Sequence, residues 1–321
     1  MIPRLVDAQD DAAVSPIGEA VAALRRARQD WRARHDVGRR PASFPARGAI
    51  EGAVELLSAA LYPRRLGQFR GTEGEEDRFV AAKLLTAATM LEREIAAELG
   101  YWEAEARSGA FERDQAATIV RLFVAELGDI RQLIDSDVEA AFLGDPAARS
   151  VDEILVCYPG AIASLHHRIA HRLYALGAPI AARMVSELAN ERTGIDIHPG
   201  ATIGASFFID HGTGVVIGET AIIGARVRLY QHVTLGARTP LADAAPGPRV
   251  RFARHPIVED DVVIYAGSTI LGRVTIGAGA VIGGNVWLLE DVAPGATVVQ
   301  PAARILPRGE GDAVREVLLD G

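Results

Sequence analysis

Side chains capable of acid–base chemistry gather in four short motifs between residues 196 and 255. The motifs are "GIDIHPG" with Asp196 and His198, "IDHGTG" with Asp210 and His211, "GET" with Glu219, and "ARHPI" with Arg254 and His255. Histidine is a natural general base near neutral pH, because its unperturbed pKa is about 6.5. A carboxylate beside an imidazole fixes its tautomer and stabilises the imidazolium that forms. The motifs therefore contain the residue types needed to activate a hydroxyl group.

The stretch that carries these motifs repeats aliphatic residues every six positions. The in-phase residues are Ile197, Ile203, Ile209, Ile217, Ile223, Leu229, Leu235, Val258, Ile264, Ile270, Ile276, Ile282 and Leu288. Four positions after each of the last six stand mostly small or β-branched residues: Val262, Ser268, Val274, Ala280, Val286 and Val292. A period of six matches neither an α-helix nor an alternating strand, and it is typical of a hexapeptide solenoid. We expect each repeat to form a short strand and a turn, with the aliphatic side chains stacked inside.

This six-residue rhythm breaks twice. The step from Ile209 to Ile217 is eight residues and surrounds His211, so the slip predicts that the His211 side chain leaves the regular wall. Residues 237–253, "ARTPLADAAPGPRVRFA", contain three prolines and no rhythm, which predicts a loop extruded from the coil. Gly218 follows the inward Ile217, where we expect a tight corner to need the permissive backbone of glycine. In a repeat protein, function is expected where the repeat is interrupted.

Residues 12–193 have helical spacing instead. In "PGAIASLHHRIAHRLYALG" one helical face holds Ile162, Leu165, Ile169, Leu173 and Leu176. Pro159 suits the first turn of this helix, and Gly177 with Pro179 suits its end. Upstream, Ser150 and Glu153 have the spacing of a capping box. Residues 39–48, "RRPASFPARG", predict a loop between helices.

Three histidines fall in this helix: His166, His167 and His171. A helical pair four residues apart could bind a metal ion, but no third ligand is evident in the sequence. We therefore expect a packed or solvated helix face, not a metal site.

Composition argues against several classes of partner. The 321 residues carry a formal net charge of −8 and no dense block of Lys and Arg, so neither nucleic acid nor an anionic membrane is expected. No run approaches about 18 apolar residues, and the N-terminus turns acidic where a signal peptide needs an apolar stretch. We expect a cytoplasmic protein. Cys157 is the single cysteine, which excludes an internal disulfide, and its apolar setting "EILVCYP" predicts a core position.

The joined elements "DIHPGATIG", "DHGTGVVIGETAIIG", "VTLGA", "RHP" and "PAARI" resemble the serine O-acetyltransferase family, closely from about Asp145 to Ile305. The resemblance implies an α+β fold, with an all-helical N-terminal domain followed by a left-handed parallel β-helix. It implies that acetyl-CoA donates an acetyl group to the hydroxyl of L-serine for cysteine biosynthesis, with no metal. The expected domains are 1–193, with an N-terminal extension over 1–70, the β-helix over 194–303, and a tail over 304–321.

The resemblance assigns the catalytic roles to His211 and Asp196. His211 corresponds to the general base, and Asp196 to the carboxylate that orients it. Asp196 precedes His211 by 15 residues. If a coil takes about 18 residues, as in the family, the two lie nearly one coil apart, and stacked strands are about 4.8 Å apart. We therefore expect a hydrogen bond between the two side chains.

Five residues match the amino-acid site of the family: Asp145, Asp210, Glu219, Arg254 and His255. The planar fork of Arg254 suits the carboxylate of serine, and carboxylates suit its ammonium group. Alternatives remain for three of the five. Asp145 could cap a helix before Pro146, Arg254 could be a solvated charge at the end of a loop, and Glu219 could satisfy a turn. His198 and His232 are expected to be structural.

For the CoA groove, the resemblance points to Ala266 and Gly284, with Tyr265 standing where a glycine is common. A CoA phosphate could meet one of the loop arginines Arg238, Arg249 and Arg251, although a solvated loop fits equally well. A backbone N–H within 212–214 is a candidate oxyanion donor.

The resemblance also implies partners. A homotrimer through the β-helix is the simpler expectation, because the longer N-terminal region puts the dimer of trimers in doubt. L-cysteine is an expected feedback inhibitor. The family tail ends in an isoleucine that binds O-acetylserine sulfhydrylase, whereas this sequence ends at Gly321, so that complex is not expected.

Three rival functions remain open. A zinc carbonic anhydrase on this scaffold needs three histidines with a close His-x4-His pair, which is missing among His198, His211, His232 and His255. Another hexapeptide acetyltransferase, acting on homoserine, a sugar or a xenobiotic, could share His211, although Asp145, Asp210 and Arg254 favour an amino acid. A non-catalytic solenoid would need no Asp–His pair.

Overall fold

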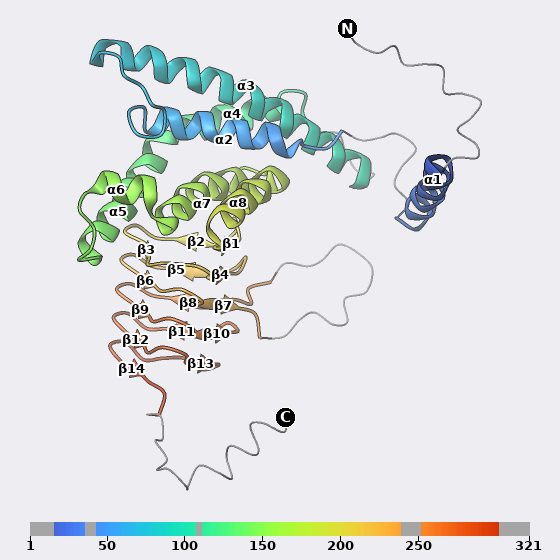
Figure 1. Ribbon diagram of the computed structural model, residues 1–321. Helices are drawn as coiled ribbons and strands as arrows, with labels where there is room; N and C mark the ends of the chain where they lie inside the picture. Colours follow the sequence, from blue (N-terminus) through green and yellow to red (C-terminus); the bar gives the residue numbers. More distant parts are fainter. Residues whose placement is uncertain (1–15, 36–42, 107–110, 239–251, 302–321) are drawn as a thin grey trace.

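A helical part stands on one end of a β-helix in the computed structural model (Figure 1). The structure describes residues 16–35, 43–106, 111–238 and 252–301. Parts of three sequence-based expectations therefore lie outside the described residues. These are most of the predicted loop 237–253, with Arg249 and Arg251, the tail 304–321 with Gly321, and residues 1–15 and 36–42 of the N-terminal extension.

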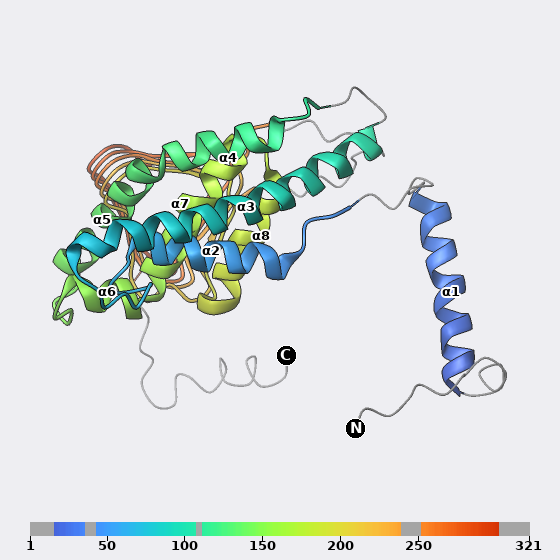
Figure 2. The same ribbon diagram turned by 90° about the horizontal axis from the view of Figure 1, so that it is seen from above.

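Helices fill the described residues before Gly194, as the spacing predicts. They are α1 (Pro16–His35), α2 (Arg47–Leu61), α3 (Glu73–Ala106), α4 (Gln115–Ala125), α5 (Leu127–Gly144), α6 (Val151–Cys157), α7 (Pro159–Ala175) and α8 (Pro179–Thr193). Of the predicted 39–48 loop, residues 43–46 are not helical, whereas Arg47 and Gly48 already belong to α2, so the loop ends two residues earlier than predicted. Helices α2 and α3 lie side by side in both views, and Figure 1 shows them above α7 and α8, while α1 lies apart (Figures 1 and 2). None of the described helices is long and apolar enough to span a membrane.

Helix α7 begins and ends where its sequence predicts. Pro159 is its first residue, and Gly177 follows its end with φ +97°, a left-handed conformation that favours glycine. Its apolar face packs into the helical core through Leu165, Ile169 and Leu173. The predicted cap upstream is also present, because Ser150 Oγ accepts a hydrogen bond from Glu153 N at 3.1 Å.

The prediction of a buried Cys157 is wrong, because its side chain is exposed. Helix α6 has seven residues and buries Ile154 and Leu155, while Val156 and Cys157 face outward. An apolar run on so short a helix can bury only one face. The packed-face expectation for the α7 histidines is confirmed for His166 and His167, which are buried.

The β-helix consists of short parallel strands on three faces. Face A holds β1 (Asp196–Ile197), β4 (Val216–Ile217), β7 (Thr234–Gly236), β10 (Thr269–Leu271) and β13 (Trp287–Leu288); face B holds β2 (Thr202–Ile203), β5 (Ile222–Ile223), β8 (Ile257–Val258) and β11 (Thr275–Ile276); face C holds β3 (Phe208–Ile209), β6 (Arg228–Leu229), β9 (Val263–Ile264), β12 (Val281–Ile282) and β14 (Thr297–Val298). Figure 1 shows these strands stacked coil upon coil.

Strand pairing stacks the six-residue series in three inward columns, which confirms the solenoid prediction. On face A, for example, the paired residues are Ile197, Ile217, Leu235, Ile270 and Leu288. Leu288 is partly buried and the others are buried. The second series, four positions on, is buried as well. Its one polar member, Ser268, donates from Oγ to the Gly283 carbonyl at 2.7 Å, so burial leaves no unsatisfied hydroxyl.

A buried ion pair joins the helical part to the first coil. Arg168 of α7 donates from Nε and Nη2 to the two carboxylate oxygens of Asp137 of α5, both at 3.0 Å. The same guanidinium donates to the carbonyls of Ile203 and Gly204, while Asp137 accepts from Phe207 N at 2.8 Å. Both side chains are almost fully buried. Because every charged atom has a partner, the pair locks α5 and α7 onto the β-helix.

Candidate active site

His211 lies at the corner between faces C and A, where the coil contains two extra residues. Asp210 N donates to Leu229 O and His232 N donates to Thr213 O, so His211 and Gly212 have no counterparts on the next coil. The first coil accordingly spans 20 positions, from Ile197 to Ile217, and the next spans 18, from Ile217 to Leu235.

The extra residues turn the His211 ring outward, as the slip in the repeat predicts. His211 has φ +59° and a side chain that is 72% exposed. Gly212 has φ +90°, and a Cβ at this position would overlap the Ile195 side chain. The backbone at this corner therefore requires glycine next to the histidine.

Two predicted substrate residues lie at the same corner, and we call Asp145, Asp210 and His211 the His211 corner. Asp210 Oδ1 lies 3.8 Å from His211 Nε2. Asp145 directly follows α5 and accepts hydrogen bonds from Tyr158 OH at 2.6 Å and Ala147 N at 2.8 Å. The hydrogen bond from Tyr158 is the main cause that lowers the pKa of Asp145, and the charges of Arg228 and His211 add to it. Asp145 is therefore an ionised acceptor beside the imidazole and does not cap the start of a helix.

The other predicted substrate residues lie at the corner between faces A and B, and we call Glu219, Arg254 and His255 the Arg254 corner. Arg254 Nη2 lies 3.2 Å from Glu219 Oε2, and Tyr174 OH of α7 donates to Glu219 Oε1 at 2.9 Å. Thr220 N donates to His255 Nδ1 at 3.1 Å. Burial, and then the charge of Arg254, lowers the pKa of His255. A neutral His255 that accepts at Nδ1 carries its proton on Nε2 and can donate it to a ligand.

Gly218 is required at this corner, but not for the expected reason. Its φ is not in the left-handed region, so the local backbone does not demand glycine. A Cβ on Gly218 would instead overlap the His255 ring. The requirement for glycine at position 218 therefore comes from the neighbouring His255 ring on the next coil, that is, from tertiary packing.

The expected hydrogen bond between Asp196 and His211 does not form within the described chain. Strand pairing places Asp196 opposite Val216 on face A, whereas His211 lies at the corner. The Asp196 carboxylate instead lies 3.5 Å from Arg183 Nη2 of α8. Burial raises the pKa of Asp196, and Arg183 opposes that shift. A single chain therefore separates the proposed base from its proposed partner.

The three CoA-groove candidates stack on the coils beyond His211. Asn285 N donates to Ala266 O, and a Cβ on Gly284 would lie 3.3 Å from the same oxygen. Tyr265 is 43% exposed and stacks on Tyr230, with ring centroids 5.0 Å apart. The small residues and the aromatic pair therefore lie on the same edge of the β-helix as His211, on the coils that follow it.

The two histidines expected to be structural have local contacts. His198 Nδ1 accepts from Gly200 N at 3.0 Å, and its ring meets Tyr174 edge to face. His232 occupies the same corner as His211 on the next coil, also with a left-handed φ, of +60°. Among the residues with described positions, no group of three His, Cys, Asp or Glu could hold a metal ion.

Sequence reasoning missed Arg228, which joins the Asp210 carboxylate to the backbone at the end of α5, next to Asp145. Its Nη2 donates to Asp210 Oδ2 at 2.6 Å, and its Nη1 donates to the carbonyl of Gly144 at 2.9 Å. The available signal was its position 18 residues after Asp210, one coil away. Since the first coil is two residues longer, that register is visible only after the strands are paired.

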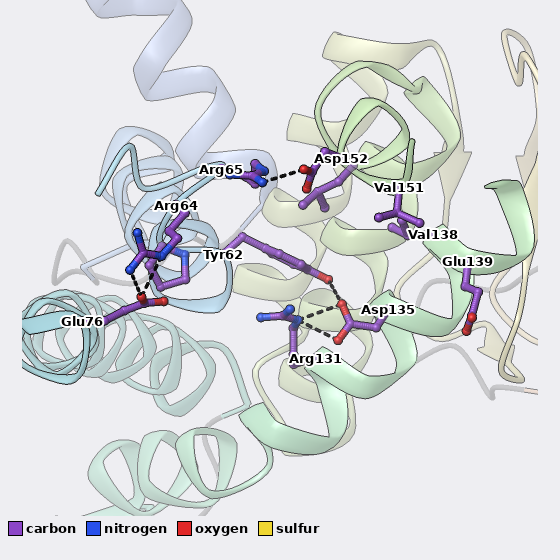
Figure 3. A pocket seen from close by; sticks show the side chains of 12 residues that line it. Tyr62, Arg64, Arg65, Glu76, Arg131, Asp135, Val138, Glu139, Val151 and Asp152 are labelled. Carbon is purple, nitrogen blue, oxygen red and sulfur yellow. Dashed lines mark hydrogen bonds and ion pairs between the residues drawn. The ribbon is translucent and has the colours of Figure 1, made fainter. Parts of the chain in front are cut away.

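A separate cavity of about 490 Å³ lies in the helical part, away from these residues (Figure 3). Its three arginines each face a carboxylate: Arg64 with Glu76, Arg65 with Asp152, and Arg131 with Asp135. Each arginine of the cavity is thus paired, Glu139 also lines the wall, and none of the lining residues belongs to the two corners, so we do not connect the cavity with the chemistry there.

Comparison with known proteins agrees with this fold. Residues 255–289 match the family model "Bacterial transferase hexapeptide (six repeats)". The chain is 45% identical over 290 residues to a plasmid serine acetyltransferase of Synechococcus elongatus, covering 88% of this chain and 90% of that protein. It is 42% identical over 187 residues to a serine acetyltransferase of Bacillus subtilis, covering 58% of this chain and 82% of the relative.

Solved structures show the same architecture. Serine acetyltransferase isoform 3 of Entamoeba histolytica, in complex with cysteine, aligns with a TM-score of 0.68 at 32% identity, over 87% of this chain and 90% of that one. Soybean serine acetyltransferase complexed with serine aligns with a TM-score of 0.50 at 29% identity, over 80% of this chain and 99% of that one.

These matches, with the stacked coils and the exposed histidine, define a hexapeptide-repeat transferase with a helical N-terminal region and a left-handed β-helix. Within that class, the identity across most of both chains settles the family: the chain belongs to the serine acetyltransferases.

Proposed function

We propose that this chain transfers the acetyl group of acetyl-CoA to the hydroxyl of L-serine, with His211 as general base, giving O-acetyl-L-serine and CoA for cysteine biosynthesis. Family membership supports the reaction and its acceptor. One observation on this chain carries the mechanism: the two extra residues turn the His211 ring out of the prism, next to the Asp210 side chain and at the corner that also holds Asp145.

In the proposed reaction, His211 removes the proton from the serine hydroxyl as its oxygen attacks the thioester carbonyl. The C–S bond of the resulting tetrahedral intermediate breaks, and the leaving CoA sulfur takes the proton from the imidazolium. The adjacent carboxylates stabilise this imidazolium. The same carboxylates attract the ammonium group of serine, while the Arg254 fork binds its carboxylate. Tyr265, Ala266 and Gly284 line the path of acetyl-CoA.

The complete site requires two copies of the chain, because one chain places its ammonium-binding and carboxylate-binding residues at opposite edges of face A. In a three-fold assembly with face A turned toward the axis, the His211 corner of one copy meets the Arg254 corner of the next. Asp196 lies on that face and would orient the partner's His211. Exposed Val216 and Trp287 on face A give the contact an apolar component. A homotrimer therefore fits the geometry, and L-cysteine would compete with serine at the same site.

The deciding experiment mixes the purified protein with acetyl-CoA and L-serine and follows release of the CoA thiol. His211→Asn removes the base while keeping a residue type that tolerates a left-handed φ. We expect turnover to fall by about 10² to 10⁴. His232→Asn is the matched control, since it makes the same change at the same corner with the same backbone conformation, and we expect wild-type turnover.

Two results would contradict the proposal. The first is no thiol release with L-serine from the wild-type protein. The second is equal turnover of the wild type and His211→Asn. Parallel assays with homoserine, threonine and a sugar hydroxyl test the acceptor, and a faster rate with any of them would replace serine as the substrate.

A further inference from the structure

We infer that Arg228 is a positioning residue of the serine site: it holds the Asp210 carboxylate and the end of α5 against each other, and it sets the charge that faces His211. The inference rests on the proposed function. It concerns a residue on β6 that has no direct contact with the reacting atoms and that acts through Asp210.

Arg228 joins the two parts of the chain that carry the acidic residues. Asp210 belongs to the first coil, and Asp145 directly follows Gly144 at the end of α5. One guanidinium donates to Asp210 Oδ2 at 2.6 Å and to the Gly144 carbonyl at 2.9 Å. A single side chain therefore ties the Asp210 carboxylate of the first coil to the residue of α5 that directly precedes Asp145.

Packing holds this guanidinium in place. Its central carbon lies 4.8 Å from the ring centroids of both Phe208 and Tyr230. A Cβ on Gly144 would lie 3.0 Å from the Phe208 ring, so glycine lets the end of α5 approach the strand. Only 26% of the Arg228 side chain and 11% of the Asp210 side chain are exposed. A planar, stacked and bidentate donor is a role that lysine cannot reproduce.

The charge balance gives Arg228 a functional consequence. Asp145 and Asp210 contribute two negative charges at this corner, Arg228 contributes one positive charge, and Tyr158 and Tyr230 are neutral, with the pKa of each raised. The corner therefore keeps one net negative charge, which matches the single ammonium group of serine. Without Arg228, two uncompensated carboxylates would favour the protonated imidazole of His211, which cannot act as a base.

The test compares Arg228→Met, Arg228→Lys and Arg226→Met by steady-state kinetics from pH 5.5 to 9. Arg226 is the matched control, because it lies two residues away and pairs with Asp260 and Asp261 on the surface. For Arg228→Met we expect the KM for serine to rise about tenfold, because Asp210 loses the guanidinium that positions it and its charged interaction with the serine ammonium group weakens. We expect the KM for acetyl-CoA to stay within about twofold of the wild type. We also expect the acid limb of the kcat/KM profile to move to higher pH.

Arg228→Lys keeps the charge but loses one of the two contacts. We expect it to retain the wild-type acid limb with an intermediate KM for serine, and we expect Arg226→Met to match the wild type in both. A wild-type KM and acid limb in folded Arg228→Met would overturn the inference, as would activity lost only in proportion to the folded fraction. If Arg228→Met does not fold, a wild-type KM for serine in Arg228→Lys overturns it. If the wild type itself transfers no acetyl group to serine, the proposed function fails instead.

Discussion

His211 faces solvent because its coil contains two residues more than the next one, namely His211 itself and Gly212. Histidine at φ +59° and glycine at φ +90° carry the chain around the wider corner while Asp210 and Thr213 keep the strands on either side in register. A non-glycine residue in the left-handed region costs free energy and persists where the surrounding structure enforces it. The same left-handed φ recurs at other corners of the coil, for example at His232, so it is a property of these turns. What distinguishes His211 is the pair of extra residues that presents its imidazole to solvent.

Arg254 provides a test of substrate binding at the scale of one residue. Its guanidinium lies against Glu219 at 3.2 Å with its side chain 28% exposed, so it can reach a ligand carboxylate from a fixed position. We expect Arg254→Ala to raise the KM for serine about tenfold or more and to leave the KM for acetyl-CoA unchanged. Arg254→Lys should recover part of the loss. An unchanged KM for serine in Arg254→Ala would show that another group binds the carboxylate.

Helix α7 connects the helical core with the β-helix, and its polar residues are buried in that contact. Arg168 pairs with Asp137, His171 donates from Nδ1 to Pro199 O at 2.9 Å, and Tyr174 reaches Glu219. His166 and His167 of the same helix are buried as well. Burial lowers the pKa of both, and for His167 the charge of Arg168 lowers it further. Both are therefore neutral in the folded chain at neutral pH.

Folding stability should consequently fall in mild acid. The unfolded chain binds a proton at each histidine near pH 6.5, whereas folded His167 does not, so the free energy of unfolding decreases as pH drops below about 6.5. The loss is about 1.4 kcal/mol per pH unit for each histidine that stays neutral, and it ends where the folded residue itself takes up a proton. Above about pH 7.5 the effect is absent.

Urea unfolding of the wild type and His167→Gln at pH 7.5 and 5.5 measures this effect. We expect the wild type to lose more stability between the two pH values than His167→Gln does. His232→Asn, which changes an exposed histidine, should retain the full wild-type pH dependence. An equal pH dependence in His167→Gln and the wild type would mean that His167 titrates alike in both states.

At the scale of the whole molecule, the site is divided between two edges of one prism. The His211 corner and the Arg254 corner flank face A, and Asp196 lies on that face without a hydrogen bond to His211. A solenoid presents extended binding surfaces along its stacked repeats. In the proposed trimer a neighbouring copy would supply the missing wall and bring the acidic corner of one chain to the Arg254 corner of the next.

Mixed assemblies test this division directly. Chains carrying His211→Asn and chains carrying Arg254→Ala are each expected to be nearly inactive at serine concentrations well below the wild-type KM. In a trimer with sites between copies, every mixed assembly regains one intact site of three. Random co-assembly at equal amounts should then recover about one quarter of the wild-type rate. No recovery from verified mixed trimers would place the whole site within one chain.

The sequence by itself determined the inward columns of the β-helix, the helical spacing before Gly194, the ends of α7 and the outward turn of His211. These depend on local periodicity, capping and backbone preference, which are properties of neighbouring residues. The sequence did not predict that Cys157 is exposed, because the buried face of a short helix is determined by the elements that it packs against. Sequence reasoning also missed the contact between Arg228 and Asp210, and it predicted a hydrogen bond between Asp196 and His211 that one chain does not form. Both points depend on the register between coils and on the face or corner that each residue occupies. Only the tertiary structure decided those positions, since they are set by strand pairing between coils and by the helices that pack on the first coil.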